Sequence, residues 1–301
     1  MTGRRQIVAK ATLLIVLSAC TFGSLSTLTV IITRAGMPLL PAMFWRYLLA
    51  ASVLLLFLRG RVVRDVRRKD ALRLMIVGGA GQAVITYLSL YALDFLPVGP
   101  LAFLFYTYPA WVALISAALG REELTLMRFI ALSIAMTGIV VMVGMPGEAH
   151  LDTFGIILAL GTAILYALYL PSLNRAQRGI SAGVSSFYLI CGVLAAFTVA
   201  NVVTGSVRMP ATIEMWGFLL VVSLFSTVLA FASLIAGLRV LGPVRTSIIA
   251  TIEPFFTAVL GAILLDQALT RSIFAGGALI AGAVLLLQLT AKDRAAKAIS
   301  A

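Results

Sequence analysis

The fold is decided by the stretch VGPLAFLFYTYPAWVALISAALGREELT, residues 98–125, because a related stretch returns as LGPVRTSIIATIEPFFTAVLGAILLDQALT, residues 241–270. Both open on Gly-Pro, carry a second proline in mid-run and end on Leu-Thr. The mid-run prolines are Pro109 and Pro254, and their separation is 254 − 109 = 145 residues. Self-similarity at a fixed spacing indicates a duplicated architecture, and this spacing divides the 301-residue chain into two halves.

The composition around this repeat is that of a membrane protein. Hydrophobic residues make up 61% of the chain and charged residues 11%, and the mean hydropathy is +1.09. Soluble globular domains contain about 45–50% apolar and about 25% charged residues. A transmembrane barrel would show weaker, alternating segments of about 10 residues, whereas these apolar runs are longer and more uniform. The sequence therefore predicts an all-α polytopic membrane protein.

Ten segments are long and apolar enough for a transmembrane helix, which needs about 20 residues. They lie at residues 10–32, 38–58, 71–93, 98–119, 125–145, 153–173, 183–204, 213–237, 243–264 and 270–290. Because each repeat holds five helices, an odd number, the second copy must enter the membrane from the opposite side. Inverted repeats of this kind are typical of secondary transporters. We predict two five-helix repeats (5+5), over residues 1–147 and 148–301, that form one membrane domain.

The basic residues predict the orientation. Nineteen of the 23 lysines and arginines fall at the two ends of the chain and on alternate connections, with seven of them between residues 59 and 73. Such residues concentrate on cytoplasmic loops, so both termini are predicted to be cytoplasmic. The net charge of +12 then matches anionic lipid headgroups. A nucleic-acid partner is not expected, because the charges are scattered over membrane loops.

The sequence resembles the drug/metabolite transporter superfamily, and in particular its EamA-type members, which have ten helices in a 5+5 arrangement. The resemblance rests on the paired stretches above and on FWRYLLA (44–50), REELT (121–125) and AGGALIAGAVLLL (275–287). Asp266-Gln267-Ala268 departs from the glutamate usual there. The resemblance implies a multi-pass protein of the bacterial inner (plasma) membrane that exports small organic molecules through a central cavity. The aromatic content makes it similar to the YddG-type aromatic amino-acid exporters.

Aromatic residues within the predicted helices are the first candidates for the substrate site. They are Phe22, Tyr87, Tyr91, Tyr106, Tyr108, Tyr166 and Tyr169. An aromatic wall would stack a flat substrate and offer hydroxyl groups, and it would attract an ammonium group through cation–π contact. On one continuous helix Tyr106 and Tyr108 would point about 200° apart, so only one of them is expected to face the cavity. The alternative for these tyrosines is an interfacial aromatic belt.

Polar groups deep in the membrane are the second set of candidates. Ser247, Thr251 and Glu253 lie in the predicted ninth helix and Arg46 in the second. A carboxylate at mid-helix costs about 3 kcal/mol on insertion scales, so Glu253 should face the interior. It would either carry protons, alternating between H⁺ and a cationic substrate, or serve as a structural residue. Arg46 would snorkel outward, pair with Glu253 or attract a substrate carboxylate.

Prolines in membrane helices leave a backbone carbonyl to be satisfied by neighbours or water. We therefore predict Pro109 and Pro254 as the hinges of an alternating-access movement between the two halves.

These features favour a secondary transporter over an enzyme. The phosphate-binding pattern GxxxxGK[ST] is missing from the sequence, so ATP drive is not indicated. A metal-dependent hydrolase needs clustered His, Asp or Glu ligands, whereas the chain has one histidine, His150. No metal, cofactor or catalytic residue is expected. The predicted function is export of small organic metabolites, most readily amino acids with aromatic ones favoured. The alternative is a proton-coupled exporter of cationic drugs that uses Glu253. The sequence does not indicate the oligomeric state.

Overall fold

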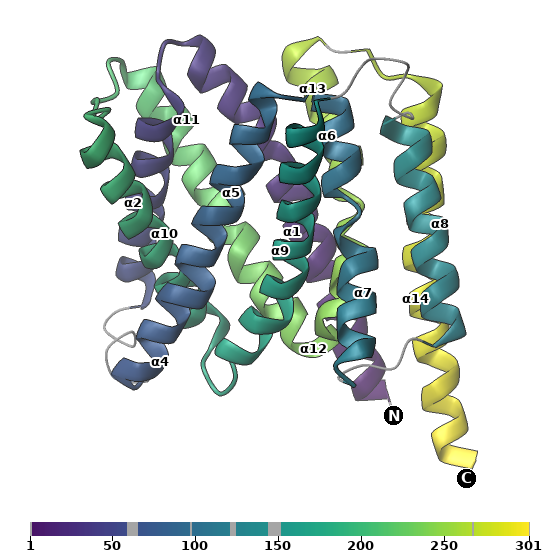
Figure 1. Ribbon diagram of the computed structural model, residues 1–301. Coiled ribbons are helices and arrows are strands. Elements are labelled where there is room, and N and C mark those ends of the chain that lie inside the picture. The colour runs from purple at the N-terminus through teal and green to yellow at the C-terminus, as the bar shows by residue number, and fades with distance from the viewer. Residues whose placement is uncertain are drawn as a thin grey trace.

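The computed structural model describes residues 2–58, 66–96, 98–120, 125–143, 152–266 and 268–300, and within these ranges it consists of helices and short connections without a strand (Figure 1). The expected all-α class is therefore confirmed. The boundary predicted between residues 147 and 148 lies outside the described residues. The same is true of most of REELT and of part of the arginine-rich loop at 59–65.

The first half of the chain contains α1 (Thr2–Arg34), α2 (Leu39–Leu58), α4 (Arg68–Arg73), the π-helix η1 (Leu74–Ala80), α5 (Gly81–Tyr91), the 3₁₀-helix η2 (Ala92–Asp94), α6 (Val98–Phe105), α7 (Tyr108–Ala118) and α8 (Leu126–Val143). The second half contains α9 (Thr153–Ala176), α10 (Ala182–Thr204), α11 (Ile213–Ser223), the π-helix η3 (Leu224–Leu229), α12 (Ala230–Ala250), α13 (Glu253–Leu265) and α14 (Arg271–Ser300). The start of α1 and the end of α14 lie at the same end of the bundle (Figure 1).

Seven helical stretches in the described part of the chain are long and apolar enough to cross a membrane, and three shorter apolar helices accompany them. The three shorter helices are Leu126–Met142, Glu253–Leu265 and Arg271–Leu287, which correspond to the predicted segments 125–145, 243–264 and 270–290. The bounds of the predicted segments differ most from the structure around residues 213–265. Gly242 departs from helical geometry (φ 77°, ψ 168°), yet helix continues on both sides of it, so one stretch runs over Ile213–Ala250. The last part of the predicted ninth helix is left as the short helix α13.

The two segments that share the Gly-Pro and mid-run proline pattern are both broken helices. A turn at Tyr106-Thr107 separates α6 from α7, and a turn at Thr251-Ile252 separates α12 from α13. Pro109 and Pro254 each stand at the second position of the helix after the turn. Proline is well accommodated there, because the first amide groups of a helix have no intrahelical acceptor. The sequence predicted continuous helices over 98–119 and 243–264, and the structure has a break in each.

Helix packing is close where glycines meet. Gly79 in η1 lies against Gly192 in α10, so near that a Cβ on Gly79 would be 2.4 Å from the Gly192 Cα atom. Gly138 in α8 meets Gly276 in α14 in the same way, and these two helices stand side by side at one edge of the bundle (Figure 1). Small residues allow this approach between membrane helices.

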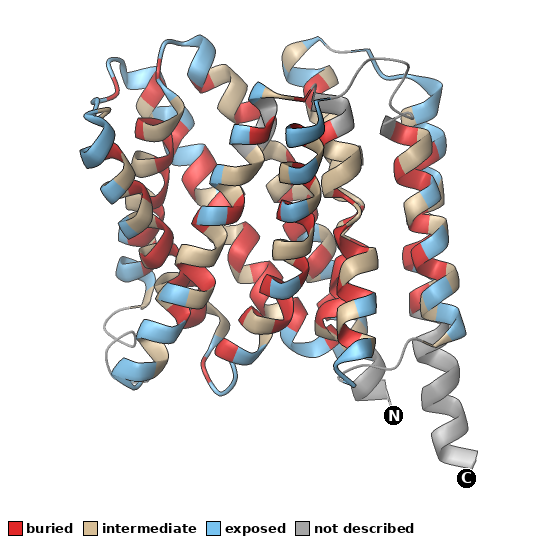
Figure 2. Ribbon diagram, viewed as in Figure 1, coloured by how far each residue is buried: buried red, intermediate tan, exposed pale blue. Residues whose placement is uncertain are grey.

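Burial follows the pattern expected in a bilayer. Buried residues gather along the helix faces that turn toward neighbouring helices, and exposed residues lie on the outer faces and at both ends (Figure 2). Many large apolar side chains remain exposed, among them Leu56, Phe57, Val203 and Ile213. Exposed apolar area of this extent marks contact with a partner or a membrane. Lipid therefore covers the outer faces of these helices.

Candidate functional site

The break at Tyr106-Thr107 creates a group of tyrosines between the two halves of the chain. The rings of Tyr106 and Tyr108 lie 6.3 Å apart between centroids. Tyr108 meets Tyr166 of α9 edge-to-face at 4.8 Å, and Tyr166 stacks on Tyr169 at 5.7 Å. We call Tyr106, Tyr108, Tyr166 and Tyr169 the tyrosine cluster. Tyr106 and Tyr108 both belong to this cluster, because the 200° separation expected between them holds only for a continuous helix.

Glu253, the first residue of α13, faces this cluster. Its carboxylate is close enough to interact electrostatically with the hydroxyl groups of Tyr106, Tyr108 and Tyr166. Among the described residues, no hydrogen bond or ion pair engages that carboxylate. The Glu253 side chain is partly exposed, as is that of Tyr166, so both are accessible. A carboxylate in this setting is available to a ligand.

The backbone around Glu253 is held from α1. Gly23 packs so closely that a Cβ there would lie 3.0 Å from the Glu253 carbonyl oxygen and 3.0 Å from Thr257 Oγ1. That hydroxyl donates to the same Glu253 carbonyl at 3.2 Å. The absence of a side chain at Gly23 thus lets α1 pack closely against the first turn of α13. This packing fixes the position of the Glu253 backbone, from which the carboxylate side chain extends.

Tyr169 has a structural bond in addition to its place in the cluster. Its hydroxyl donates to the Gly78 carbonyl oxygen at 3.1 Å, and its side chain is buried. Gly78 belongs to the π-helix η1, and its carbonyl oxygen also accepts from the Gly81 backbone N–H. Tyr169 therefore ties α9 to η1 at the back of the cluster.

Two of the predicted aromatic residues lie elsewhere. The rings of Tyr87 and Tyr91 on α5 stack on each other at 6.2 Å between centroids, and the two residues are 55% and 40% exposed. Their aromatic contacts continue through Phe95 to Phe154 at the start of α9. No ring contact among the described residues joins this group to the tyrosine cluster. No contact given for the described residues joins Tyr87 or Tyr91 to Glu253.

Three further predicted site residues are engaged in packing. Ser247 and Thr251 are fully buried and donate to carbonyl oxygens of their own helix, those of Val244 at 2.8 Å and Ile248 at 2.6 Å. Phe22 packs edge-to-face on Phe231 at 5.0 Å. None of the three is brought to the Glu253 carboxylate by a contact of the described side chains.

Arg46 is a buried cation held by the π-helix η3. Its side chain is 1% exposed, so it does not snorkel to the membrane surface. The guanidinium donates to Thr227 Oγ1 at 2.6 Å and to the Ser226 carbonyl at 3.0 Å, and it lies over the Tyr47 ring at 4.7 Å. It forms no ion pair with Glu253. Sequence reasoning missed Thr227 and Ser226, because they lie about 180 residues away with no local signal.

The chemistry of the site is that of recognition. Within the described residues, no group of three or more His, Cys, Asp or Glu side chains is placed to hold a metal ion. The Glu253 carboxyl group lies beside an aromatic wall formed by the tyrosine rings. Such a surface suits a flat molecule with an ammonium group, because a cation gains from both the carboxylate and the ring faces.

Comparisons with known proteins agree with the fold. The model of the EamA-like transporter family matches the chain twice, over residues 9–144 and 153–289. A protein of Archaeoglobus fulgidus, described as an uncharacterized transporter, is 26% identical over 272 residues, which cover 90% of this chain and 94% of that protein. One crystal structure of a protein superposes with a TM-score of 0.75 at 18% identity, and covers 94% of this chain and 98% of that one.

Proposed function

The chain belongs to the EamA-like transporter family, and we propose that it is a secondary transporter for small organic molecules that carry an ammonium group, with aromatic amino acids favoured. Membrane transport itself follows from the family and from the apolar helices. The substrate class is carried by one observation, the Glu253 carboxylate set against Tyr106, Tyr108 and Tyr166 without a hydrogen-bond partner among the described side chains.

The proposed contacts use the two properties of such a substrate. Its ammonium group replaces the missing cationic partner of Glu253, and a charge-assisted hydrogen bond contributes about 1.5–3 kcal/mol. Its aromatic ring lies against Tyr108 or Tyr166, where offset or edge-to-face contact adds about 0.5–1.5 kcal/mol. A molecule that has only one of the two properties would bind more weakly.

We further propose export from the cytoplasm across a bacterial inner membrane, by alternating access of two inverted five-helix repeats with both termini cytoplasmic. The broken helices support this movement. Transporters with inverted repeats use discontinuous helices to form the substrate site near the middle of the membrane. The turns at Tyr106-Thr107 and Thr251-Ile252, followed by Pro109 and Pro254, are the hinges of the proposed rocking movement.

A proton-coupled exporter of cationic drugs is the second candidate function. It is favoured by the engagement of Arg46, because a substrate carboxylate would need a cation that is free to bind it. Arg46, the buried cation, is engaged by Thr227 and Ser226. In this alternative Glu253 binds a proton when the substrate leaves and releases it when the next cation binds.

Transport into proteoliposomes distinguishes the two candidates. The panel contains labelled phenylalanine and tryptophan, a neutral sugar as negative control and one cationic dye, each with and without a pH gradient. Saturable movement of the amino acids without a gradient supports the first function. Dye movement that requires the gradient supports the second, and saturable movement of the sugar alone contradicts both.

A further inference from the structure

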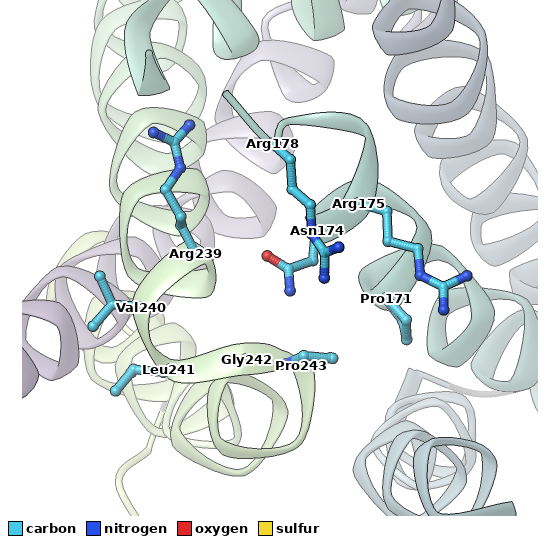
Figure 3. A pocket seen from close by; sticks show the side chains of 9 residues that line it. All are labelled: Pro171, Asn174, Arg175, Arg178, Arg239, Val240, Leu241, Gly242 and Pro243. Atoms are coloured by element: carbon cyan, nitrogen blue, oxygen red, sulfur yellow. The ribbon is translucent and has the colours of Figure 1, made fainter. Parts of the chain in front are cut away.

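A cavity of about 380 Å³ lies where the end of α9 faces the bend in α12 (Figure 3). It is distinct from the tyrosine cluster, with which it shares no lining residue. Pro171, Leu241 and Pro243 give it an apolar wall. Asn174 and three arginines, Arg175, Arg178 and Arg239, give it a polar wall.

Gly242 determines the shape of this cavity. Its φ of 77° lies in the left-handed region that favours glycine, so α12 bends there and Pro243 starts the next helical stretch. The bend carries the chain across the bottom of the cavity and opposite Asn174 (Figure 3). A helix that continued straight past Gly242 would not close this side of the cavity.

All charged residues that line the cavity are positively charged. Its lining contains three arginines and no aspartate or glutamate. Arg239 donates to the carbonyl oxygens of Gln177 and Ile180 and so fixes the turn that follows α9. The Arg178 guanidinium and the Asn174 amide extend into the space in front of Gly242, whereas Arg175 points away to the rim (Figure 3). An anion in that space would meet two donor groups and the field of three positive charges.

We propose that this cavity binds a phosphate group, either in an anionic phospholipid headgroup or in a soluble organic phosphate. A guanidinium group matches phosphate oxygens with paired hydrogen bonds. The cavity lies at the end of the bundle that the basic residues predict to be cytoplasmic, where anionic lipids attract basic sites. Val240, which also lines it, is 45% exposed, so the apolar wall continues to the outer face where acyl chains would lie.

Lipid binding to the purified full-length protein tests the proposal. Native mass spectrometry compares phosphatidylglycerol with phosphatidylcholine on the wild type, Arg178→Gln and Arg73→Gln. Arg73 is the matched control, because it is exposed, is predicted to face the same membrane leaflet and does not line the cavity. Loss of one charge-assisted bond should weaken phosphatidylglycerol binding about tenfold in Arg178→Gln and leave Arg73→Gln and phosphatidylcholine binding unchanged.

Soluble glycerol 3-phosphate separates the two sources of the phosphate. If it displaces phosphatidylglycerol and binds the wild type by itself in an Arg178-dependent manner, the ligand is a soluble phosphate. If only the lipid binds, the ligand is a headgroup. Equal phosphatidylglycerol binding by the wild type and Arg178→Gln, or an equal loss in Arg73→Gln, overturns the proposal. Arg178→Lys, which keeps the charge but not the paired bonds, gives the same test with an intermediate loss if Arg178→Gln does not fold.

Discussion

Tyr108 and Glu253 occupy equivalent positions in the two halves of the chain and face the same ring, that of Tyr166. Each is the first residue of the helix that follows a break, and each is followed by a proline. Their separation, 253 − 108 = 145 residues, equals that of the two prolines. Tyr108 contacts Tyr166 edge-to-face, and Glu253 interacts with it electrostatically. The duplicated element thus supplies an aromatic hydroxyl from one half and a carboxylate from the other.

Replacement of Tyr166 should separate the roles of its ring and its hydroxyl. Tyr166→Leu removes the ring face and should raise the half-saturating concentration of an aromatic cation by up to about tenfold, because offset or edge-to-face contact with the substrate's ring contributes about 0.5–1.5 kcal/mol. Tyr166→Phe should change it little. Substrate titration of transport measures both. Tyr87→Leu is the control, since Tyr87 lies outside the tyrosine cluster, and a loss there as large as in Tyr166→Leu would contradict this assignment.

The clamp around Arg46 should matter for stability. Thr227→Val removes the hydroxyl that accepts from Arg46 Nε and leaves a buried charged donor unpaired, at a cost of about 1–3 kcal/mol. The melting temperature of the purified protein should fall accordingly. Thr137→Val is the comparison, because the Thr137 hydroxyl is exposed and bonds only to a carbonyl of its own helix. Equal melting temperatures for the two variants would show that the clamp does not stabilise the fold.

The contact between η1 and α10 should tolerate no side chain at Gly79. Gly79→Ala would place a methyl group 2.4 Å from the Gly192 Cα atom, and the backbones must separate. Overpacking of this kind costs about 1–3 kcal/mol, so the melting temperature should fall. Gly217→Ala in α11, where nothing lies within 4 Å of the added Cβ, should leave it unchanged or raise it. A similar response of both variants would argue against close helix contact at Gly79.

The fold could be predicted in outline from the apolar runs and the repeat, because lipid requires long helices whatever their partners. The breaks within the helices could not be predicted from the sequence. Pro109 and Pro254 mark where a helix is weakened, but a kink and a full break both satisfy that signal. The turns at Tyr106-Thr107 and Thr251-Ile252 depend on how α9 and α1 pack beside them. The boundary predicted before residue 243 coincides with the bend at Gly242, but the sequence did not show that helix continues on both sides of it, since a single glycine fits a helix, a kink or a turn.

The candidate site was predicted in part. Side-chain chemistry indicated Glu253 and the tyrosines as candidates, and the structure brings Glu253 to Tyr106, Tyr108 and Tyr166. Tyr106 and Tyr108 can both join this cluster because the helix is broken between them. In a continuous helix their side chains would point about 200° apart. Tyr87 could not be separated from the others by sequence, because an exposed tyrosine and an inward one have the same neighbours along a uniformly apolar helix.

The most direct test of the account compares Glu253→Gln with the wild type for phenylalanine and for the corresponding amine without the carboxylate. Glu214→Gln, which changes an exposed carboxylate at the start of α11, is the control. The measurement is the half-saturating concentration of transport in proteoliposomes. If Glu253 binds the ammonium group, Glu253→Gln should raise it about 10- to 100-fold for both substrates, the loss expected for one charged hydrogen bond, and Glu214→Gln should not. If Glu253→Gln transports both substrates with the half-saturating concentrations of the wild type, the claim that this carboxylate binds the substrate is contradicted.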